Sequence, residues 1–162
     1  MDLFSKYINY KCKIKKIILK LIIKDLKFEK DLMFRNNFFI KINGGSIKIG
    51  KGCFFNNNCS INSLGSVEIG DDCIFGENVK IYDHNHNYGI GKITSKSGYS
   101  IGKVKIKDNV WIGSNVTILK DVVIGKNVVI GANCLIYKSI PDNSVVKCKS
   151  HIEIEKMYSE EK

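Results

Sequence analysis

Residues 106–141 read IKDNVW-IGSNVT-ILKDVV-IGKNVV-IGANCL-IYKSIP, with isoleucine at every sixth position. The same step recurs in three earlier blocks, so that large apolar anchors run through most of the chain. The anchors are Phe28, Phe34, Ile40, Ile49, Phe55, Ile61, Ile69, Phe75, Ile81, Ile106, Ile112, Ile118, Ile124, Ile130 and Ile136. A fixed period of this kind indicates a repeat architecture.

Two further positions of the repeat also carry one kind of residue. The residue four places after an anchor is mostly apolar, and it lies on the same face of a strand as the next anchor. The residue three places after an anchor is mostly Asn, Asp, Gly or Ser, which favour turns. Each unit is therefore a short strand and a corner, and three units close one triangular coil. The repeat predicts an all-β, single-stranded parallel β-helix of about five coils over residues 28–146.

The six-residue frame is interrupted most strongly at residues 87–103, where the chain leaves the coil. Loops of this length in a compact domain are usually functional. Residues 1–27 combine apolar residues at helical spacing with many lysines, which predicts a basic amphipathic helix. We expect this helix to cap the first coil, with peripheral contact to a membrane surface as the alternative. Residues 147–162 form a C-terminal tail, which is acidic toward its end.

Composition excludes several classes of protein. Hydrophobic residues make up 44% of the 162 residues, which argues against a disordered chain. No apolar run approaches the roughly 18–20 residues of a membrane span, and no secretory signal is recognisable, so the expected location is the cytoplasm. The formal net charge is +10, but the lysines are spread out and no nucleic-acid-binding motif appears. We therefore expect no nucleic-acid partner.

Four of the six cysteines occupy the small inward position of the repeat. They are Cys53, Cys59, Cys73 and Cys134. Because buried free cysteine behaves as a small hydrophobe, we expect these four to be reduced core residues. Cys12 and Cys148 lie outside the frame, and the sequence assigns them no role.

The motif Ile/Val-Gly followed by four variable residues, as in Ile112-Gly113 and Ile130-Gly131, resembles that of the hexapeptide-repeat acyltransferases. Three segments are similar to the sugar and polysaccharide O-acetyltransferases within that family: IYDHNH at 81–86, NVWIGS at 109–114, and GANCLIYKSIP at 131–141. The resemblance implies a left-handed β-helix and a homotrimer with active sites between subunits. It also implies acetyl-CoA as the acyl donor and a sugar or polysaccharide precursor as the acceptor.

The resemblance also assigns roles to individual residues. His84 matches the general base. His86 is not part of this match; its position two residues after His84 makes it a candidate for binding the acceptor, or for the base in place of His84. Trp111 matches a tryptophan that lines the site. The positions expected to hold CoA are Ser114, Ala132, Tyr137 and Lys138. After them the chain departs from the family, because Lys147-Cys148-Lys149-Ser150 replaces the usual G-x-P-A turn at the adenine end of the CoA site.

His84 also stands out on chemical grounds. It occupies a position that elsewhere holds a turn residue, directly before the long loop. A histidine titrates near neutrality and can take the proton of an acceptor hydroxyl. On an extended strand the neighbouring Asp83 should point away from His84, so we expect another group to orient the imidazole. A zinc site is disfavoured, because the only histidines are His84, His86 and the distant His151.

Two alternatives to sugar O-acetylation remain open. The same fold supports N-acetylation of an amino-sugar nucleotide, and a β-helix can also serve as a non-catalytic assembly module. The sequence does not name the acceptor.

Overall fold

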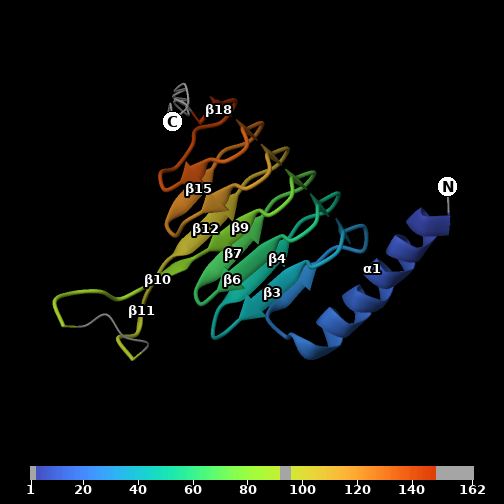
Figure 1. Cartoon of the computed structure of the whole chain (residues 1–162), viewed down its shortest axis with the longest axis horizontal. Helices are drawn as coiled ribbons and strands as arrows, with labels where there is room; N and C mark the ends of the chain where they lie inside the picture. The colour runs from blue at the N-terminus through green and yellow to red at the C-terminus, as the bar shows by residue number, and fades with distance from the viewer. Residues whose placement is uncertain (1–2, 92–95, 149–162) are drawn as a thin grey trace, which may run out of the picture.

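The computed structural model describes residues 3–91 and 96–148, which form one N-terminal helix and a stacked β-helix (Figure 1). Helix α1 spans Leu3–Ile22. The strands of the first three coils are β1 Leu26–Phe28, β2 Met33–Phe34, β3 Phe39–Ile42, β4 Ser46–Ile49, β5 Phe54–Phe55, β6 Ser60–Ser63, β7 Ser66–Ile69, β8 Ile74–Phe75 and β9 Lys80–Tyr82. The later coils contain β12 Lys103–Ile106, β13 Trp111–Ile112, β14 Thr117–Ile118, β15 Val122–Ile124, β16 Val129–Ile130, β17 Leu135–Ile136 and β18 Val145–Val146.

The strands stack into three parallel sheets, one for each face of a triangular prism. Sheet A has the order β1-β4-β7-β12-β15, sheet B runs from β2 through β5, β8, β13 and β16 to β18, and sheet C has the order β3-β6-β9-β14-β17. Five coils are complete, and a bridge between Ile124 and Ile140 together with β18 adds part of a sixth. The predicted left-handed β-helix of about five coils is therefore confirmed, with this extra partial coil.

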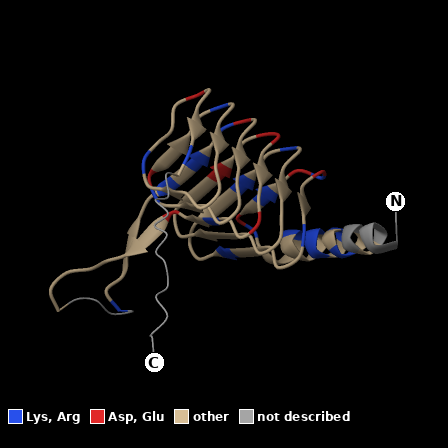
Figure 2. Cartoon of the chain, turned by 45° about the horizontal axis from the view of Figure 1, so that its top comes forward, with Lys and Arg blue, Asp and Glu red and all other residues tan. Residues whose placement is uncertain are grey.

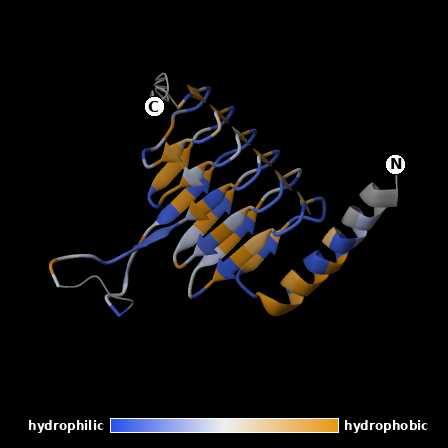
Figure 3. Cartoon of the chain, viewed as in Figure 1, coloured by the Kyte–Doolittle hydropathy of each residue, from blue (hydrophilic) through white to orange (hydrophobic). Residues whose placement is uncertain are grey.

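The anchors fill the interior because the parallel register places each one directly on its counterpart in the next coil. Ile69 pairs with Ile106, and Ile106 pairs with Ile124. All anchors are buried except Ile40, which is half-buried. Apolar and polar residues alternate along the strands in Figure 3, as expected when one face of each strand meets the core. Near the first coils the core contains a column of stacked aromatic rings, Phe34, Phe38, Phe55 and Phe75.

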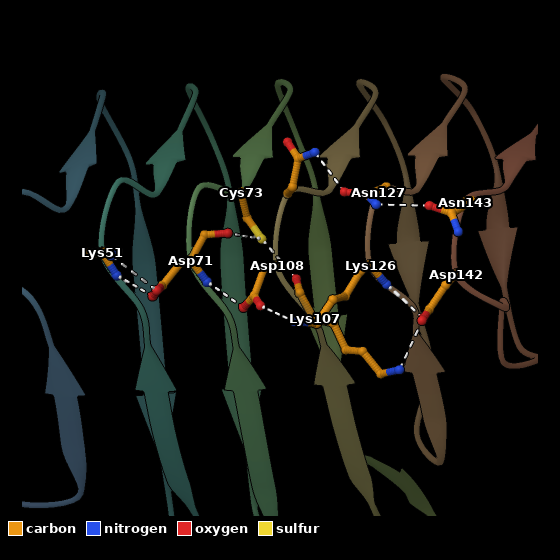
Figure 4. Close-up of polar contacts among 10 residues, drawn as sticks. Lys51, Asp71, Cys73, Lys107, Asp108, Lys126, Asn127, Asp142 and Asn143 are labelled. Atoms are coloured by element: carbon orange, nitrogen blue, oxygen red, sulfur yellow. Dashed lines mark hydrogen bonds and ion pairs between the residues drawn. The ribbon is translucent and has the colours of Figure 1, made fainter.

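The corners confirm the role expected for the turn residues. Ten of them adopt φ between 54° and 68°: Asn37, Gly52, Asn58, Asp72, Asn78, Asn109, Asn115, Asp121, Asn127 and Asn133. Neighbouring coils are also linked by side chains at these corners, as Figure 4 shows for the corner between sheets A and B. Asn109 donates to Asn127, Asn127 donates to Asn143, and Asp142 accepts from the backbone N–H of Lys126 at 2.9 Å.

Helix α1 lies across the open end of the first coil, where strand edges and core would otherwise be exposed (Figure 1). Cys12 is buried against the core, and Leu19 is partly buried there. Lys15 donates to the carbonyl oxygen of Phe38, and Lys16 donates to the carbonyls of Lys30 at 2.8 Å and Leu32 at 3.0 Å. Burial lowers the pKa of the Lys15 ammonium. The inner side of the helix is thus a cap that covers apolar core and also binds free carbonyl groups.

Within residues 3–91 and 96–148, no helix is both long and apolar enough to cross a bilayer. Most of the C-terminal tail, including His151, lies outside the described residues.

The cysteines follow the repeat, with one correction. Cys53, Cys59, Cys73 and Cys134 are buried, as expected, and all six thiols are free. Cys12, which lies outside the repeat, is also buried, because it lies on the side of α1 that covers the first coil. Cys148 is exposed.

We therefore expect a thiol titration of the native protein at pH 8 to detect one fast-reacting group, Cys148. The thiolate is the reactive form, and burial raises the pKa of the Cys59 and Cys134 thiols. Cys148→Ser should remove the fast phase, and denaturant should restore reaction of the remaining five. Several fast thiols in the folded variant would contradict the assigned register of the coils.

Candidate functional site

A β-hairpin interrupts the solenoid between its third and fourth coils. Strand β10, His84–His86, pairs with the antiparallel β11, Tyr99–Ile101, and the hairpin projects to one side of the coils in Figure 1. The chain leaves the coil at a bend at Asp83 and rejoins it at β12, which begins at Lys103. Residues 92–95 of the expected loop 87–103 lie outside the described residues. His84 is consequently the first residue of the hairpin and not a coil corner.

The bend overturns the expectation that Asp83 points away from His84. The two side chains meet, with 2.9 Å between His84 Nδ1 and Asp83 Oδ1. The expectation assumed an extended strand, in which adjacent side chains lie on opposite faces. Because the chain turns out of the coil at Asp83, that alternation does not continue into His84.

Asp83 is completely buried, yet both of its carboxylate oxygens are satisfied. Oδ2 accepts from the hydroxyl of Ser63 at 2.6 Å and from the N–H of Gly65 at 2.9 Å. Oδ1 accepts from the N–H of Leu64 at 2.9 Å in addition to its contact with His84. A buried carboxylate is costly unless donors surround it, and here the preceding coil supplies three of them.

Crowding around this carboxylate explains a glycine in the preceding coil. A Cβ atom added to Gly65 would lie 2.2 Å from the carbonyl oxygen of Gly102, where the chain re-enters the coil. The N–H of Gly102 in turn donates to the carbonyl of Asp83 at 2.7 Å. Glycine at position 65 therefore lets the two ends of the hairpin close over Asp83.

The hydrogen-bond network selects the tautomer of His84. Asp83 Oδ1 is a carboxylate oxygen that also accepts from the backbone N–H of Leu64, so it acts as an acceptor toward the imidazole as well. Nδ1 of His84 is therefore assigned the proton. Nε2 then carries the free lone pair and can accept a proton. The side chain of His84 is 18% exposed, so it remains accessible while the carboxylate beneath it is sealed. This is the arrangement that a general base requires.

The pocket beside His84 is formed by consecutive coils and the hairpin. Its lining residues are Lys41, Asn43, Asn62, Ser63, Leu64, Tyr82, His84 and Tyr99. The ring of Tyr99 meets that of His84 edge to face, with centroids 5.4 Å apart, and lies 4.6 Å from that of His86. His84 and His86 are thus brought to one aromatic side chain of the opposite hairpin strand. Among the described residues no group of three His, Cys, Asp or Glu could hold a metal ion.

The remaining candidate residues lie elsewhere on the prism. Trp111 is on the outer side of sheet B and is 56% exposed. Ser114 and Ala132 occupy successive coils at the corner between sheets B and C, where the N–H of Asn133 donates to the carbonyl of Ser114. Tyr137 and Lys138 follow the last strand of sheet C, and the Lys138 ammonium lies 5.6 Å from the Tyr137 ring centroid. Within the described residues, none of the proposed CoA residues therefore lines the pocket beside His84.

Trp111 belongs to an apolar ladder that runs along the outside of sheet B. Its members are in register on successive strands: Met33, Phe54, Ile74, Trp111, Val129 and Val145. Met33, Ile74, Trp111 and Val145 are each between 47% and 64% exposed. The outer side of sheet A differs, since Lys48, Glu68 and Lys105 follow one another there. An exposed apolar strip of this kind is typical of an interface.

Two family models match the chain, and both describe hexapeptide repeats. The model for the bacterial transferase hexapeptide (six repeats) matches residues 103–138. The model for the hexapeptide repeat of succinyl-transferase matches residues 46–82. The two matches lie on either side of the hairpin.

Solved structures of acetyltransferases share the fold. A hexapeptide-repeat-containing acetyltransferase from Vibrio cholerae superposes with a TM-score of 0.72 at 23% identity, over 83% of this chain and 74% of that one. A maltose O-acetyltransferase from Clostridium difficile 630 is 28% identical over 96% of this chain and 90% of its own, with a TM-score of 0.67. A galactoside acetyltransferase in complex with coenzyme A is 29% identical over 81% of this chain and 63% of its own, with a TM-score of 0.61.

Sequence reasoning missed Asp83, Ser63, Gly65 and Tyr99 as parts of the site. A signal for two of them was present. Asp83 lies two residues after the anchor Ile81, and Ser63 lies two residues after the anchor Ile61, so both belong to the inward face of sheet C. A carboxylate and a hydroxyl at inward positions of neighbouring coils predict a buried polar pair. Tyr99 carried no such signal, because its position depends on the pairing of the hairpin.

Replacing Asp83 with Asn should preserve its size but remove the charge that holds the proton on Nδ1 of His84. Nitrogen-15 NMR of the imidazole should show the Nδ1–H tautomer in the wild type and a shift toward Nε2–H in Asp83→Asn. The side-chain amide of the new Asn would turn an N–H toward groups that donate to Asp83 in the wild type. The variant should therefore lose about 1–3 kcal/mol of stability. Ser63→Ala is the control, since it removes a donor to Asp83 but leaves the contact with His84. An unchanged tautomer in Asp83→Asn would show that Asp83 does not orient the ring.

Proposed function

We propose that this chain, as a member of the hexapeptide-repeat acyltransferases, transfers the acetyl group of acetyl-CoA to a hydroxyl of a sugar or polysaccharide precursor. The observation that carries the proposal is His84, held through Nδ1 by the buried Asp83 and partly exposed beside a pocket. The similarity to a maltose O-acetyltransferase and to a galactoside acetyltransferase in complex with coenzyme A supports both the donor and the class of acceptor.

The proposed reaction is a direct transfer without a covalent enzyme intermediate. Nε2 of His84 accepts the proton of the acceptor hydroxyl while that oxygen attacks the thioester carbonyl, which forms the new C–O bond. The resulting tetrahedral oxyanion collapses and breaks the C–S bond. The departing CoA sulfur takes the proton back from the imidazolium, so that ester, free CoA thiol and neutral His84 result.

Asp83 contributes to this reaction without touching the substrate. Its carboxylate keeps the proton on Nδ1 before the transfer and stabilises the imidazolium during it. The donors from Ser63, Leu64 and Gly65 hold the carboxylate in place, so it need not reorganise as the charge develops. We place His86 and Tyr99 on the acceptor side, because both lie on the hairpin next to His84.

The donor site requires a second copy of the chain. In this proposal Ser114, Ala132, Tyr137 and Lys138 of one copy hold CoA against His84 of the next, in a homotrimer. Trp111 lines the site between the two copies. Cyclic trimers use head-to-tail contacts, in which one surface meets a different surface of the neighbour. The apolar ladder on sheet B is suited to such a contact. The contact would bring the ladder of one copy, which includes Trp111, toward the hairpin of another.

We also propose a reducing compartment, the cytoplasm, as the location. Six free cysteines in a chain of this size fit a compartment in which disulfides do not persist. We assign peripheral contact with a membrane to α1.

Replacing His84 with Ala should lower kcat by about 10²–10⁴, because proton removal in the transition state is lost. Affinity for CoA should be retained, since the residues proposed to bind it belong to other coils. Release of free thiol from acetyl-CoA, screened against sugars and sugar nucleotides, measures the rate, and calorimetric titration measures CoA binding.

His86→Ala is the matched control for this experiment. It should act mainly on the KM for the acceptor, because His86 lies on the same hairpin strand but does not contact Asp83. Normal turnover in His84→Ala with an inactive His86→Ala would transfer the role of base to His86. Normal turnover in both variants would exclude the proposed mechanism.

Introducing a charge into the apolar ladder should dissociate the trimer. Ile74→Asp, next to Trp111, would bury an unpaired carboxylate at the interface, which costs about 3–5 kcal/mol. Sedimentation velocity should show a trimer for the wild type and monomers for the variant, and thiol release should fall with the loss of the trimer. Val123→Asp introduces the same charge at an exposed position of sheet A and should remain trimeric and active. A monomeric, active wild type would contradict the shared site.

A further inference from the structure

We propose that the outer face of helix α1 rests on an anionic membrane surface. This face carries a stripe of large apolar side chains that nothing in the described chain covers. Its members are Tyr7, Tyr10, Ile14, Ile17, Ile18, Leu21 and Ile22, which are between 41% and 79% exposed.

The exposed stripe is not a consequence of capping the coil. The cap uses the opposite side of the helix, where Cys12 and Leu19, together with Ile23 directly after the helix, meet the core. At 3.6 residues per turn, the exposed stripe is centred about half a turn away from these inner residues. One face of α1 therefore completes the solenoid, while the other presents exposed apolar side chains.

The charges around the stripe indicate what covers it. Lys11, Lys13, Lys20 and Lys24 are exposed at its margins, and residues 3–24 contain no Asp or Glu. In Figure 2 the described part of this helix carries the blue of basic residues and none of the red of acidic ones. Lysines beside an apolar face can extend their ammonium groups to lipid phosphates while the face enters the interfacial region.

A second copy of the chain fits this face less well. Paired helices would bring lysine margins together without any carboxylate between them, and like charges at close range repel. The stripe also spans roughly 140° of the helix circumference, which is wider than the narrow seam of a coiled coil. A flat anionic surface matches both the width of the stripe and the sign of the charge.

Cyclic symmetry would strengthen this contact. In the proposed trimer all three copies of α1 lie at the same height along the symmetry axis, so they can meet one surface together. Once one helix is bound, the other two are held near the surface at a high effective concentration, so the three weak contacts reinforce one another. The membrane contact of a single helix does not depend on the trimer or on the acetyl transfer.

The test is co-sedimentation of the full-length protein with large vesicles, either phosphatidylcholine alone or a 7:3 mixture with phosphatidylglycerol. We expect binding to the anionic vesicles, little binding to the neutral ones, and weaker binding as salt rises and screens the lysines. The double variant Ile17→Asp/Leu21→Asp should bind at least about tenfold more weakly, because two charges would enter the apolar interface. Its melting temperature should be unchanged, since both side chains are exposed.

The control is Ile90→Asp, which places one charge on the fully exposed apolar side chain of the hairpin, away from α1. This variant should bind vesicles as the wild type does. A wild type that stays in the supernatant with anionic vesicles would overturn the proposal. A lipid-free assembly that becomes smaller in Ile17→Asp/Leu21→Asp would also overturn it, because the stripe would then be covered by another copy.

The same variants separate this proposal from the proposed function. His84→Ala should bind anionic vesicles normally, because its site lies on the hairpin. Conversely, Ile17→Asp/Leu21→Asp should release thiol at the wild-type rate with any soluble acceptor that the screen identifies.

Discussion

The structure depends on one geometric constraint, the six-residue step that returns the chain to the same direction after three corners. A large apolar side chain must point inward once per step, and a residue that tolerates positive φ must turn most of the corners. The isoleucine anchors and the Asn and Asp corners meet both demands. Parallel stacking then places each anchor directly on the anchor of the next coil. Because the strands of the coils all turn one face toward the core, the preference of each residue for a strand or a corner agrees with the overall fold throughout the solenoid.

This agreement is the reason that the coils could be predicted from the sequence. The anchors, the inward cysteines and most of the corners have the positions expected of them. The prediction failed at the residues where the repeat stops. Asp83 was expected to point away from His84, but the bend at Asp83 ends the alternation on which that expectation depended. The burial of Cys12 was not predicted for a similar reason, since this residue belongs to α1 and not to the repeat.

The failure at Asp83 is informative about the site. A regular coil has no place for a buried carboxylate, so one can be held only where neighbouring backbone supplies donors. The preceding coil does this with Leu64 and Gly65, and the outgoing hairpin brings His84 to the same carboxylate. Sequence alone could not assemble this site, because it depends on the register between the second and third coils and on the path of the hairpin. The same holds for the apolar ladder on sheet B, which exists only once the strands are stacked.

The number of coils in a solenoid sets the distance between its parts, here between α1 at one end and the hairpin that carries His84. The strands of adjacent coils lie about 4.8 Å apart, so His84, which follows the third coil, stands roughly 10 Å beyond the first. Helix α1 adds a thickness of about 10 Å. With the outer face of α1 on a bilayer and the solenoid upright, the proposed base, His84, would therefore stand about 20 Å above the surface. An acceptor hydroxyl that a membrane lipid holds at that height would reach His84 while the lipid itself stays in the bilayer. A hydroxyl close to the lipid headgroups would lie too low to reach His84. The number of coils between α1 and the hairpin would in this way contribute to the choice of acceptor, in addition to the side chains that line the pocket.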